Sequence, residues 1–346
     1  MVLSYYILKL PYTIIFNLLT LLKLNNYFAA YIGDELDYYI MEPVLRFIPE
    51  LKLISKNKRI QHYLADKGLI STLLPAFPKG VLMCRLAAHK FPATKMVKIG
   101  MRHGPYHFKS LSNKRNYLLF DQFIFTSEHE ARIAQESEII NGIGIGYPKL
   151  DKAFNGEIDQ NMINELKVQM GFDNSKKTLL FTSTWEGSGM SAIDKWYNKL
   201  YLLAEDYNIL VSLHPWTSKK YRYEIEKSRN ITLIRGYDTT PYIMIADICI
   251  GDTSSILGDC CALDKPIITF EVDTAHRTTP EITELIKSFS ISIKDFDELI
   301  PAIKQYENTP DLKKGERKKA NDIMFSNLDG SASKKAAEFI RKEFNI

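Results

Sequence analysis

Three adjacent hydroxyl side chains, Thr253, Ser254 and Ser255, follow a short apolar run at positions 248–250. The apolar run predicts a buried strand, and the residues after the hydroxyl cluster predict a helix. Hydroxyl groups and the unpaired first N–H groups of a helix donate to phosphate oxygens, so the segment predicts a phosphate site. An ordinary N-cap by Thr253 or Ser254 is the alternative. Asp259 lies four residues beyond Ser255 on the same helical face, where it can accept from ribose hydroxyls.

The elements that must position this cluster are short apolar runs separated by helical patterns. In the second half of the chain, buried strands are predicted at 178–181, 209–213, 231–234, 248–250 and 267–270. In the first half, strands are predicted at 80–86, 96–101 and 122–126, and a helix at 127–136. Such alternation predicts doubly wound parallel sheets, which bind ligands beyond the carboxyl ends of their strands.

Length and composition restrict the class of protein. The 346 residues exceed one ordinary compact domain and suit two α/β domains with a terminal extension. An apolar fraction of 45% and a charged fraction of 25% are typical of a folded protein, and a formal charge of +4 is too small to indicate nucleic-acid binding. The cysteines lie in apolar stretches without CxxC spacing, which predicts reduced core thiols and a cytoplasmic protein. They are Cys84, Cys249, Cys260 and Cys261.

The first 24 residues are strongly apolar, but Lys9, Pro11, Asn17 and Lys23 interrupt them. No run of about 20 apolar residues is therefore available to span a bilayer. A signal peptide is not expected either, because Lys9 splits the apolar core.

A helix is predicted after Pro11, a residue that suits a first helical turn. One face of it is aliphatic and the other polar, which predicts a helix that lies in the membrane interface. The aliphatic residues are Ile14, Ile15, Leu18, Leu19 and Leu22, and the aromatic residues expected at headgroup level are Tyr5, Tyr6, Tyr12 and Phe16. A helix docked on the first domain is an equally good interpretation.

The run Gly142-Ile143-Gly144-Ile145-Gly146 is similar to a dinucleotide-binding loop. That fingerprint needs a final glycine on the entering helix, whereas here Tyr147 takes its place and Pro148 follows. We therefore expect a strand that leads to an interdomain turn.

Five segments, in the correct order along the chain, resemble motifs of the CDP-glycerol glycerophosphotransferase family. The hydroxyl cluster from Gly251 to Asp259, followed by Lys265-Pro266, resembles the family's TDYSS-x-x-FD and KP segment. The other four are Arg102 to Lys109 (family WHGTPxK), Ile145 to Asp151 (GYPR-x-D), Leu180 to Trp185 (Y-A-P-T-W) and His214-Pro215 (HP). The likeness covers roughly 56–340 and ends at Asp329-Gly330-Ser331-Ala332-Ser333, similar to the closing D-G-x-A-S. Several motifs in order are more specific than any one of them.

Some residues depart from the family pattern. Arg102 replaces a Trp, Pro105 a Thr, and Glu186 an Arg that commonly follows the Trp. Because an Arg-to-Glu exchange beside a phosphate site reverses the local field, either Glu186 points away or the substrate differs from the usual one.

The resemblance implies an α/β fold with two Rossmann-like domains facing a cleft (GT-B). The apolar pattern of the first residues adds an N-terminal membrane-interface helix to this expectation. We expect an apolar membrane-associating segment at 1–50 and an acceptor-side domain at 51–150. A donor-binding domain with C-terminal helices is expected at 151–346.

The implied reaction moves glycerophosphate, or a related polyol phosphate, from CDP-glycerol to a hydroxyl of a lipid-linked acceptor. This chemistry belongs to the synthesis of teichoic-acid-like or capsular polymers. It would take place peripherally, on the inner, cytoplasmic face of the cell membrane.

The resemblance also implies roles for individual residues. His103 is the candidate general base, with His107 as second choice, because an imidazole accepts a proton at neutral pH. His214, with the three hydroxyls, Thr184 and Lys109, would hold the pyrophosphate. His103 as a packing or capping loop residue, and His214 as a buried histidine satisfied by a backbone carbonyl, are the alternatives.

No DxD, HExxH or clustered carboxylate spacing indicates a metal site, so we expect no cofactor. Asp252 and Asp259 are the remaining candidates for a weak Mg²⁺ contact. Two other functions stay open: a GT-B glycosyltransferase or epimerase using a UDP- or CMP-sugar, and a non-catalytic membrane-associated protein of polymer assembly.

Overall fold

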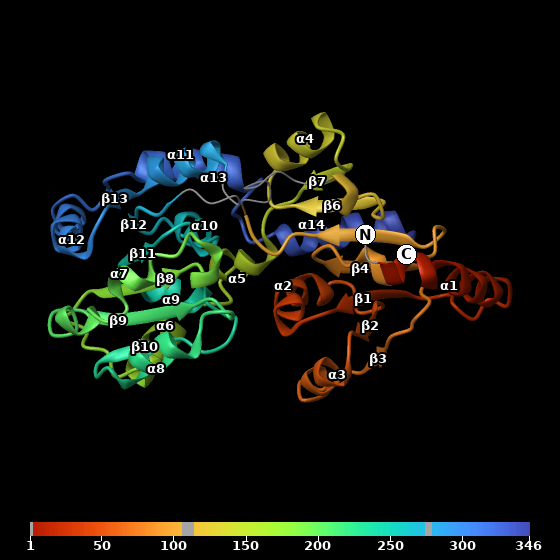
Figure 1. Ribbon diagram of the computed structural model, residues 1–346, viewed down its shortest axis with the longest axis horizontal. Helices are drawn as coiled ribbons and strands as arrows, with labels where there is room; N and C mark the ends of the chain where they lie inside the picture. The colour runs from red at the N-terminus through yellow and green to blue at the C-terminus, as the bar shows by residue number, and fades with distance from the viewer. Residues whose placement is uncertain (1–2, 106–113, 274–278) are drawn as a thin grey trace. The chain divides into compact units, whose positions relative to one another are not determined.

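The computed structural model describes residues 3–105, 114–273 and 279–346. The chain forms two compact units, drawn in Figure 1. Of the described residues, unit 1 comprises 3–105, 114–151 and Phe325–Ile346, and unit 2 comprises Lys152–Met324. Each unit is a parallel sheet with packed helices, which confirms the predicted α/β class.

Unit 1 is built on a parallel sheet that has seven strands in the described part of the chain, in the order β3-β2-β1-β4-β5-β6-β7. The strands are β1 (Phe28–Ile32), β2 (Lys52–Ser55), β3 (Ser71–Leu73), β4 (Gly80–Cys84), β5 (Val97–Met101), β6 (Gln122–Phe125) and β7 (Gly142–Gly144). Strand β7 confirms the strand predicted in the glycine-rich run. Gly144 is required there, because a Cβ at this position would lie 2.0 Å from the backbone nitrogen of Glu128.

Several helices pack with the strands of this sheet. They are α2 (Glu35–Leu45), α3 (Lys58–Ala65), α4 (Glu128–Glu136) and α14 (Ala332–Phe344). Helix α14, blue in Figure 1, lies among the red, orange and yellow elements of unit 1 and packs against α2. Its buried Ile340 and Phe344 join Ile40 and Met41 of α2 in one core with the central strands.

Two of the predicted domain boundaries are wrong. Residues 28–45 form β1 and α2 of unit 1, because β1 pairs with both β2 and β4 inside the sheet and its residues 29–32 are buried. The C-terminal helix α14 does not belong to the second domain, because its apolar face completes the core of unit 1. The chain passes from unit 1 to unit 2 at α5 (Asp151–Phe154).

Unit 2 contains a parallel sheet with six strands among the described residues, in the order β10-β9-β8-β11-β12-β13. The strands are β8 (Thr178–Ser183), β9 (Asn208–Leu213), β10 (Ile231–Leu233), β11 (Ile248–Gly251), β12 (Ile267–Phe270) and β13 (Ile291–Ile293). The first five confirm strands predicted from apolar runs. Such runs are typical of strands that are covered on both faces.

The helices of unit 2 are mostly short. They are α6 (Gln160–Gln169), α7 (Ile193–Trp196), α8 (Lys219–Lys227), α9 (Thr240–Ile245), α10 (Ile256–Ala262), α11 (Pro280–Phe289), α12 (Leu299–Asn308) and α13 (Lys314–Met324). Trp196 of α7 and Ile303 of α12 pack in one core with Phe181, Val211 and Phe270 of the strands. This core fixes the sheet whose carboxyl ends carry the polar motifs.

The N-terminal helix α1 (Leu3–Leu21) begins well before Pro11, which lies inside it. One side docks on unit 1: Tyr5, Tyr12 and Phe16 are buried, and the Tyr12 hydroxyl donates to the carbonyl of Ala76. The expected headgroup position of these three aromatic residues is therefore wrong. The other side bares large apolar side chains that are 44–79% exposed. They are Tyr6, Ile7, Leu8, Leu10, Ile14, Ile15, Leu18 and Leu21.

None of the helices within the described ranges is long and apolar enough to cross a membrane. All four cysteines are buried and form no disulfide, which confirms the prediction of core thiols.

Candidate functional site

The polar motifs of unit 2 follow three neighbouring strands. His214 comes directly after β9, Thr184 after β8, and Asp252 after β11, and these strands lie side by side in the order β9-β8-β11. Because the strands are parallel, their carboxyl ends meet at one edge of the sheet. The motif residues are therefore brought together by the topology of unit 2 alone.

Asp252 is the centre of this edge, and its side chain is 1% exposed. Its carboxylate accepts from the hydroxyls of Ser183 (2.6 Å) and Thr184 (2.7 Å) on β8 and the loop after it. It also accepts from the amides of Thr184, Ala192, Thr253 and Ser254, at 2.6–3.1 Å. One buried carboxylate thus ties the loops after β8 and β11 together.

The sequence analysis considered Asp252 only as a weak Mg²⁺ contact. In the structure its two oxygens are surrounded by donors of the protein, so it organises the loops instead. The signal for this role was its place between a buried strand and a row of hydroxyl residues. A carboxylate at such a strand end accepts readily from the amides that follow it.

The hydroxyl cluster differs from the prediction in two ways. Ser255, not Thr253 or Ser254, is the N-cap of α10, and its side chain makes no capping hydrogen bond, so the N-cap alternative is wrong for both residues. The amides of Leu257 and Gly258 donate to the carbonyls of Ser254 and Ser255 at 3.0 Å. The expectation of unpaired first helical N–H groups is therefore wrong for these two.

The hydroxyl of Thr253 is a buried polar atom without a hydrogen-bond partner among the described residues. It borders a cavity of about 140 Å³ at the carboxyl ends of β11 and β12, lined further by Thr269, Glu271 and Lys287. A buried hydroxyl without a partner costs free energy unless a ligand or water satisfies it. Thr253 is therefore placed to donate to a bound oxygen.

Thr184 and Asp259 lie in less favourable places for their predicted roles. The single hydroxyl proton of Thr184 goes to Asp252, so this group positions the carboxylate and is not offered to a phosphate. Asp259 is on α10 as predicted, but its side chain is 3% exposed. A ribose contact by Asp259 stays a prediction.

His214 has a defined tautomer. The amide of Trp216 donates to Nδ1 of His214 at 3.1 Å, so the neutral imidazole carries its proton on Nε2. Arg222 donates to the carbonyl of His214 at 2.8 Å and fixes the loop. The ring is half-buried rather than buried and presents an N–H donor, which is the polarity a phosphate oxygen requires.

Glu186 points to the neighbouring loop. Its Oε1 accepts from the amide of Ser218 at 2.9 Å, just before α8. The pKa of Glu186 is lowered, because hydrogen bonds from backbone amides and from Ser218, with the charge of Arg222, outweigh the opposing effect of desolvation. Glu186, which stands where the family commonly has Arg, thus links the loop after β8 to the loop after β9.

In unit 1, His103 follows β5 and is exposed. Its carbonyl accepts from the Tyr147 hydroxyl at 2.8 Å, and its Nδ1 lies 3.5 Å from the Arg102 guanidinium. Two of the segments that carry the resemblance are therefore in contact. His103 is held by its backbone while its ring faces outward, so the alternative of a packing residue is not supported.

Arg102 is buried beside this histidine, with 9% of it exposed. Burial lowers the pKa of its guanidinium, and the carboxylate of Glu130 acts in the opposite direction. Glu130 is fixed in turn by the Thr126 hydroxyl at 3.2 Å. The residue that replaces the family's Trp therefore fills a core position with a charged group that has a counter-ion nearby.

Asp151 joins two further motif segments of unit 1. Its carboxylate accepts from the amides of Ala332 (3.2 Å) and Ser333 (2.6 Å) at the start of α14. These segments therefore cap a helix and secure the return of the chain to unit 1.

Lys109 and His107 lie outside the described residues. Over the described ranges, no group of three or more His, Cys, Asp or Glu side chains converges as a metal site.

Similarity to known proteins agrees with this geometry. The model of the family described as CDP-Glycerol:Poly(glycerophosphate) glycerophosphotransferase matches residues 89–342, which is well over half of the chain. The chain belongs to this family. Membership of the glycerophosphotransferase family confirms the resemblance found in the sequence.

Curated relatives of this chain are distant. It is 26% identical over 212 residues to the teichoic acid glycerol-phosphate primase of Bacillus spizizenii, covering 56% of this chain and 54% of that protein. It is 23% identical over 175 residues to the teichoic acid poly(glycerol phosphate) polymerase of Staphylococcus epidermidis, covering 48% of this chain and 24% of that protein. The chain thus spans about half or less of the length of these relatives.

Solved structures show the same fold. The wall teichoic acid polymerase TagF superimposes with a TM-score of 0.66 at 16% identity, over 98% of both chains. UDP-GlcNAc 2-epimerase of Neisseria meningitidis gives 0.64 at 16% identity, over 91% of this chain and 100% of that one. This chain therefore has a GT-B-type fold. This fold serves different chemistries and does not choose between them.

Proposed function

We propose that this chain transfers glycerophosphate from CDP-glycerol to an acceptor hydroxyl in the synthesis of a teichoic-acid-like polymer. The acceptor oxygen forms a bond to the phosphorus that carries glycerol. The bond between this phosphorus and the bridging pyrophosphate oxygen breaks, and CMP leaves with the electron pair. The acceptor proton passes to a general base.

One observation carries this proposal. Three segments that resemble family motifs follow the adjacent strands β9, β8 and β11, and they meet at one edge of unit 2. The edge offers the Nε2–H of His214 and the unpaired hydroxyl of Thr253, with the loops held by Asp252. Donors fixed in place before the reaction stabilise charge that develops on a leaving phosphate. TagF, a similar structure, has been solved after a soak with CDPG.

The roles of the residues follow from this chemistry. His214, Thr253, Ser254 and Ser255 hold the pyrophosphate, and Thr184 acts through Asp252. His103 accepts the acceptor proton, since its ring is exposed after β5. Lys109 and Asp259 are kept as proposed contacts to pyrophosphate and ribose.

The donor is tested by ligand-induced stabilisation and by product release. CDP-glycerol, CDP-ribitol and a UDP-sugar are compared for the rise in thermal midpoint that each causes, because a ligand bound only by the folded state must stabilise it. CMP release in the presence of a glycerophosphate acceptor then reports transfer. Stabilisation by UDP-sugars alone would favour the glycosyltransferase or epimerase alternative. Stabilisation by CDP-glycerol without turnover would favour a binding protein.

The base is tested with His103→Ala. We expect kcat to fall by about 10²–10⁴-fold, the usual contribution of a general base, while the thermal shift with CDP-glycerol stays unchanged. His62→Ala is the matched control, because His62 is exposed on α3. Equal kcat for His103→Ala and wild type would remove His103 from catalysis.

The attachment to a membrane is also part of the proposal. The bare aliphatic side of α1 lies opposite the side that docks on unit 1. Lys23 follows the helix, and Lys9 lies within it over the ring of the docked Tyr5. An apolar helix side with lysines near it fits the headgroup region of an anionic bilayer. We therefore place the enzyme peripherally on the cytoplasmic face of the cell membrane, where a lipid-linked acceptor is presented.

A further inference from the structure

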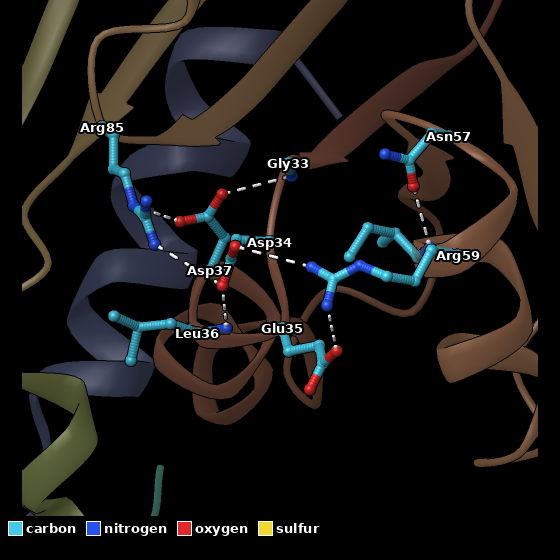
Figure 2. A network of polar contacts seen from close by, with 9 residues as sticks. Gly33, Asp34, Glu35, Leu36, Asp37, Asn57, Arg59 and Arg85 are labelled. Atoms are coloured by element: carbon cyan, nitrogen blue, oxygen red, sulfur yellow. Dashed lines mark hydrogen bonds and ion pairs between the residues drawn. The ribbon is translucent and has the colours of Figure 1, made fainter. Parts of the chain in front are cut away.

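A second polar cluster lies at the carboxyl edge of the unit 1 sheet, at the ends of β1 and β4 and on helices α2 and α3 (Figure 2). Arg85, directly after β4, pairs with Asp37 at 2.6 Å, and the amide of Gly33 donates to the same carboxylate at 3.1 Å. Asp34 lies between Arg85 (3.9 Å) and Arg59 (3.8 Å). The reaction proposed above uses none of these residues.

The cluster combines one buried side chain with two that solvent reaches. The Asp37 side chain is 4% exposed, whereas Asp34 and Arg85 are 34% and 39% exposed. Asp34 also caps α2, because its Oδ1 accepts from the amide of Leu36 at 3.2 Å. A buried Asp37 therefore fixes the loop, and Asp34 and Arg85 extend from it toward solvent.

The hydroxyl of Tyr31 is an independent sign of a ligand. Tyr31 is 1% exposed, and its hydroxyl has no hydrogen-bond partner among the described residues. It reaches the loop after β1: a Cβ on Gly33 would lie 3.5 Å from this oxygen and 3.0 Å from Oδ2 of Asp37. The side chains of Tyr31 and Asp37 therefore pack closely around Gly33, and the tyrosine supplies a buried polar atom that remains unsatisfied.

Two lysines on either side of β1 add positive charge. Lys56 follows β2, and Lys90 ends the short helix Ala88–Lys90 beyond β4, while β1 lies between β2 and β4. Neither ammonium group has a hydrogen bond or an ion pair with any residue in the described ranges. Burial, and after it the charge of Lys56, lowers the pKa of Lys90. Two lysines whose positive charges act on one another favour an anion beside them.

We propose that this edge binds the phosphorylated polyol end of the acceptor, with Lys56 and Lys90 on the phosphate and Asp34 accepting from the polyol hydroxyls. The inference rests on the proposed transfer reaction, whose acceptor it specifies. Carboxylates accept from hydroxyls and ammonium groups bind phosphate as point charges, so the pair recognises a molecule that carries both.

The topology relates this site to His103. Strands β1 and β5 are two positions apart in the sheet, so their ends lie roughly 10 Å from one another. A phosphate bound beside β1 thus places the next part of the acceptor toward the loop after β5. Of these residues only Lys90 falls within the segment matched by the family model, 89–342.

The test uses the full-length chain and two probes, sn-glycerol 3-phosphate and inorganic phosphate, with dissociation constants from calorimetry. We expect Lys56→Gln combined with Lys90→Gln to weaken both probes about tenfold or more, since each charge-assisted contact is lost. Asp34→Asn should weaken sn-glycerol 3-phosphate only. Lys79→Gln is the control, because Lys79 is exposed directly before β4, at the amino ends of the same strands.

Two results would overturn the site: no binding of either probe to the wild type, or equal binding by the double lysine variant. Transfer assays on the same proteins separate this failure from that of the reaction. If the double variant transfers normally with an unchanged acceptor KM, the proposed site is contradicted and the proposed reaction stands. If the wild type shows no transfer but binds the probes in a lysine-dependent way, the proposed reaction is contradicted and the proposed site stands. Loss of binding to phosphatidylglycerol vesicles, with unchanged sn-glycerol 3-phosphate binding, would reassign the lysines to lipid and overturn the acceptor assignment.

Discussion

At the scale of single residues, carboxylates do most of the positioning in both units. Asp252 holds the loops after β8 and β11, Asp37 holds the loop after β1 through Gly33, and Asp151 holds the start of α14. Each is buried and accepts from backbone amides. A buried carboxylate is costly without such partners, so these residues stabilise one loop conformation in particular.

Asp252→Asn tests this role in unit 2. The amide group would face hydroxyl and N–H donors, so we expect the free energy of unfolding to fall by at least about 3 kcal/mol. Stabilisation by CDP-glycerol should be lost as well. Urea titration measures the first effect and the thermal midpoint the second. Asp173→Asn, in an exposed turn, serves as control, and equal unfolding midpoints for the two variants would contradict the role.

The raised pKa of Asp37 predicts that the free energy of unfolding depends on pH. Burial raises the pKa of Asp37 to about 6 from its ordinary 3.8, although the charge of Arg85 opposes the shift. Between these values the folded state binds the proton more tightly than the unfolded state, so this stabilisation is present below pH 4 and is lost as pH rises through 6. Relative to Asp37→Asn, the wild type should lose about 2 kcal/mol between pH 4.5 and 7.5.

Urea titrations of both proteins at these two pH values measure the difference directly. The comparison with the variant cancels the other titrating groups, while Arg85, Asp34 and Tyr31 remain as the charged and ionisable neighbours of Asp37. A difference that does not change with pH would show that Asp37 is ionised at little cost.

The sequence places the hydroxyls and His214 at the ends of buried strands, as the structure does, but does not show how they are held. The hydrogen bonds from Ser183 and Thr184 to Asp252 form because β8 and β11 are neighbours in the sheet. Chain order does not state that adjacency. The place of Asp252 before the hydroxyl residues therefore indicated its contacts with the amides that follow it, but not its link to β8.

At the scale of elements, strand prediction succeeded for β4 to β12, including the three-residue β7 and β10, and missed β1, β2, β3 and β13. Strands β8, β9, β11 and β12 were predicted because both of their faces are covered. Strand β1 was missed because its five residues follow an apolar helix, which hides the change of period. Strand β3, with the sequence Ser-Thr-Leu, is too short and polar to give a signal at the sheet edge.

The two-sided character of α1 gives a prediction at this scale. Replacing Leu10, Ile14 and Leu18 together by Ser removes part of the exposed apolar side without touching the docked side. We expect binding to phosphatidylglycerol vesicles to fall at least tenfold, as about 1.5–3 kcal/mol is lost for each apolar side chain withdrawn from lipid. The thermal midpoint should stay within a few degrees. Vesicle sedimentation measures the first effect.

Phe16→Ala is the matched variant on the docked side. Phe16 is buried against unit 1, so its loss should lower the free energy of unfolding of that unit by about 3–5 kcal/mol. If the triple Ser variant sediments with vesicles as well as the wild type does, α1 is a docked helix without a membrane role.

At the scale of the whole molecule, the chain leaves unit 1 at Asp151 and returns to it at Phe325. The sequence placed the change of unit after residue 150 but assigned every later residue to the second domain. The amphipathic pattern of α14 predicts that one face of the helix packs against a core, but not which of the two sheets belongs to that core. Ile340 and Phe344 contact the core of unit 1, which places α14 in unit 1.

Ending the chain at Met324 tests the importance of this return. Without α14, the face of the sheet covered by Ile340 and Phe344 is exposed, and we expect unit 1 to lose its cooperative unfolding transition. Unit 2 should keep its transition and its stabilisation by CDP-glycerol. Calorimetry distinguishes the two transitions. A truncated protein with both transitions intact would show that α14 is dispensable for unit 1.

The return of the chain at α14 also bears on biosynthesis. A ribosome delivers residues in order, so the whole of unit 2 has emerged before Ile340 and Phe344 exist to close the first core. The unit whose strands are made first is consequently completed after the other unit. Until then its open sheet and the apolar side of α1 are both available to chaperones, and a chain truncated before α14 would hold a finished unit 2 and an incomplete unit 1.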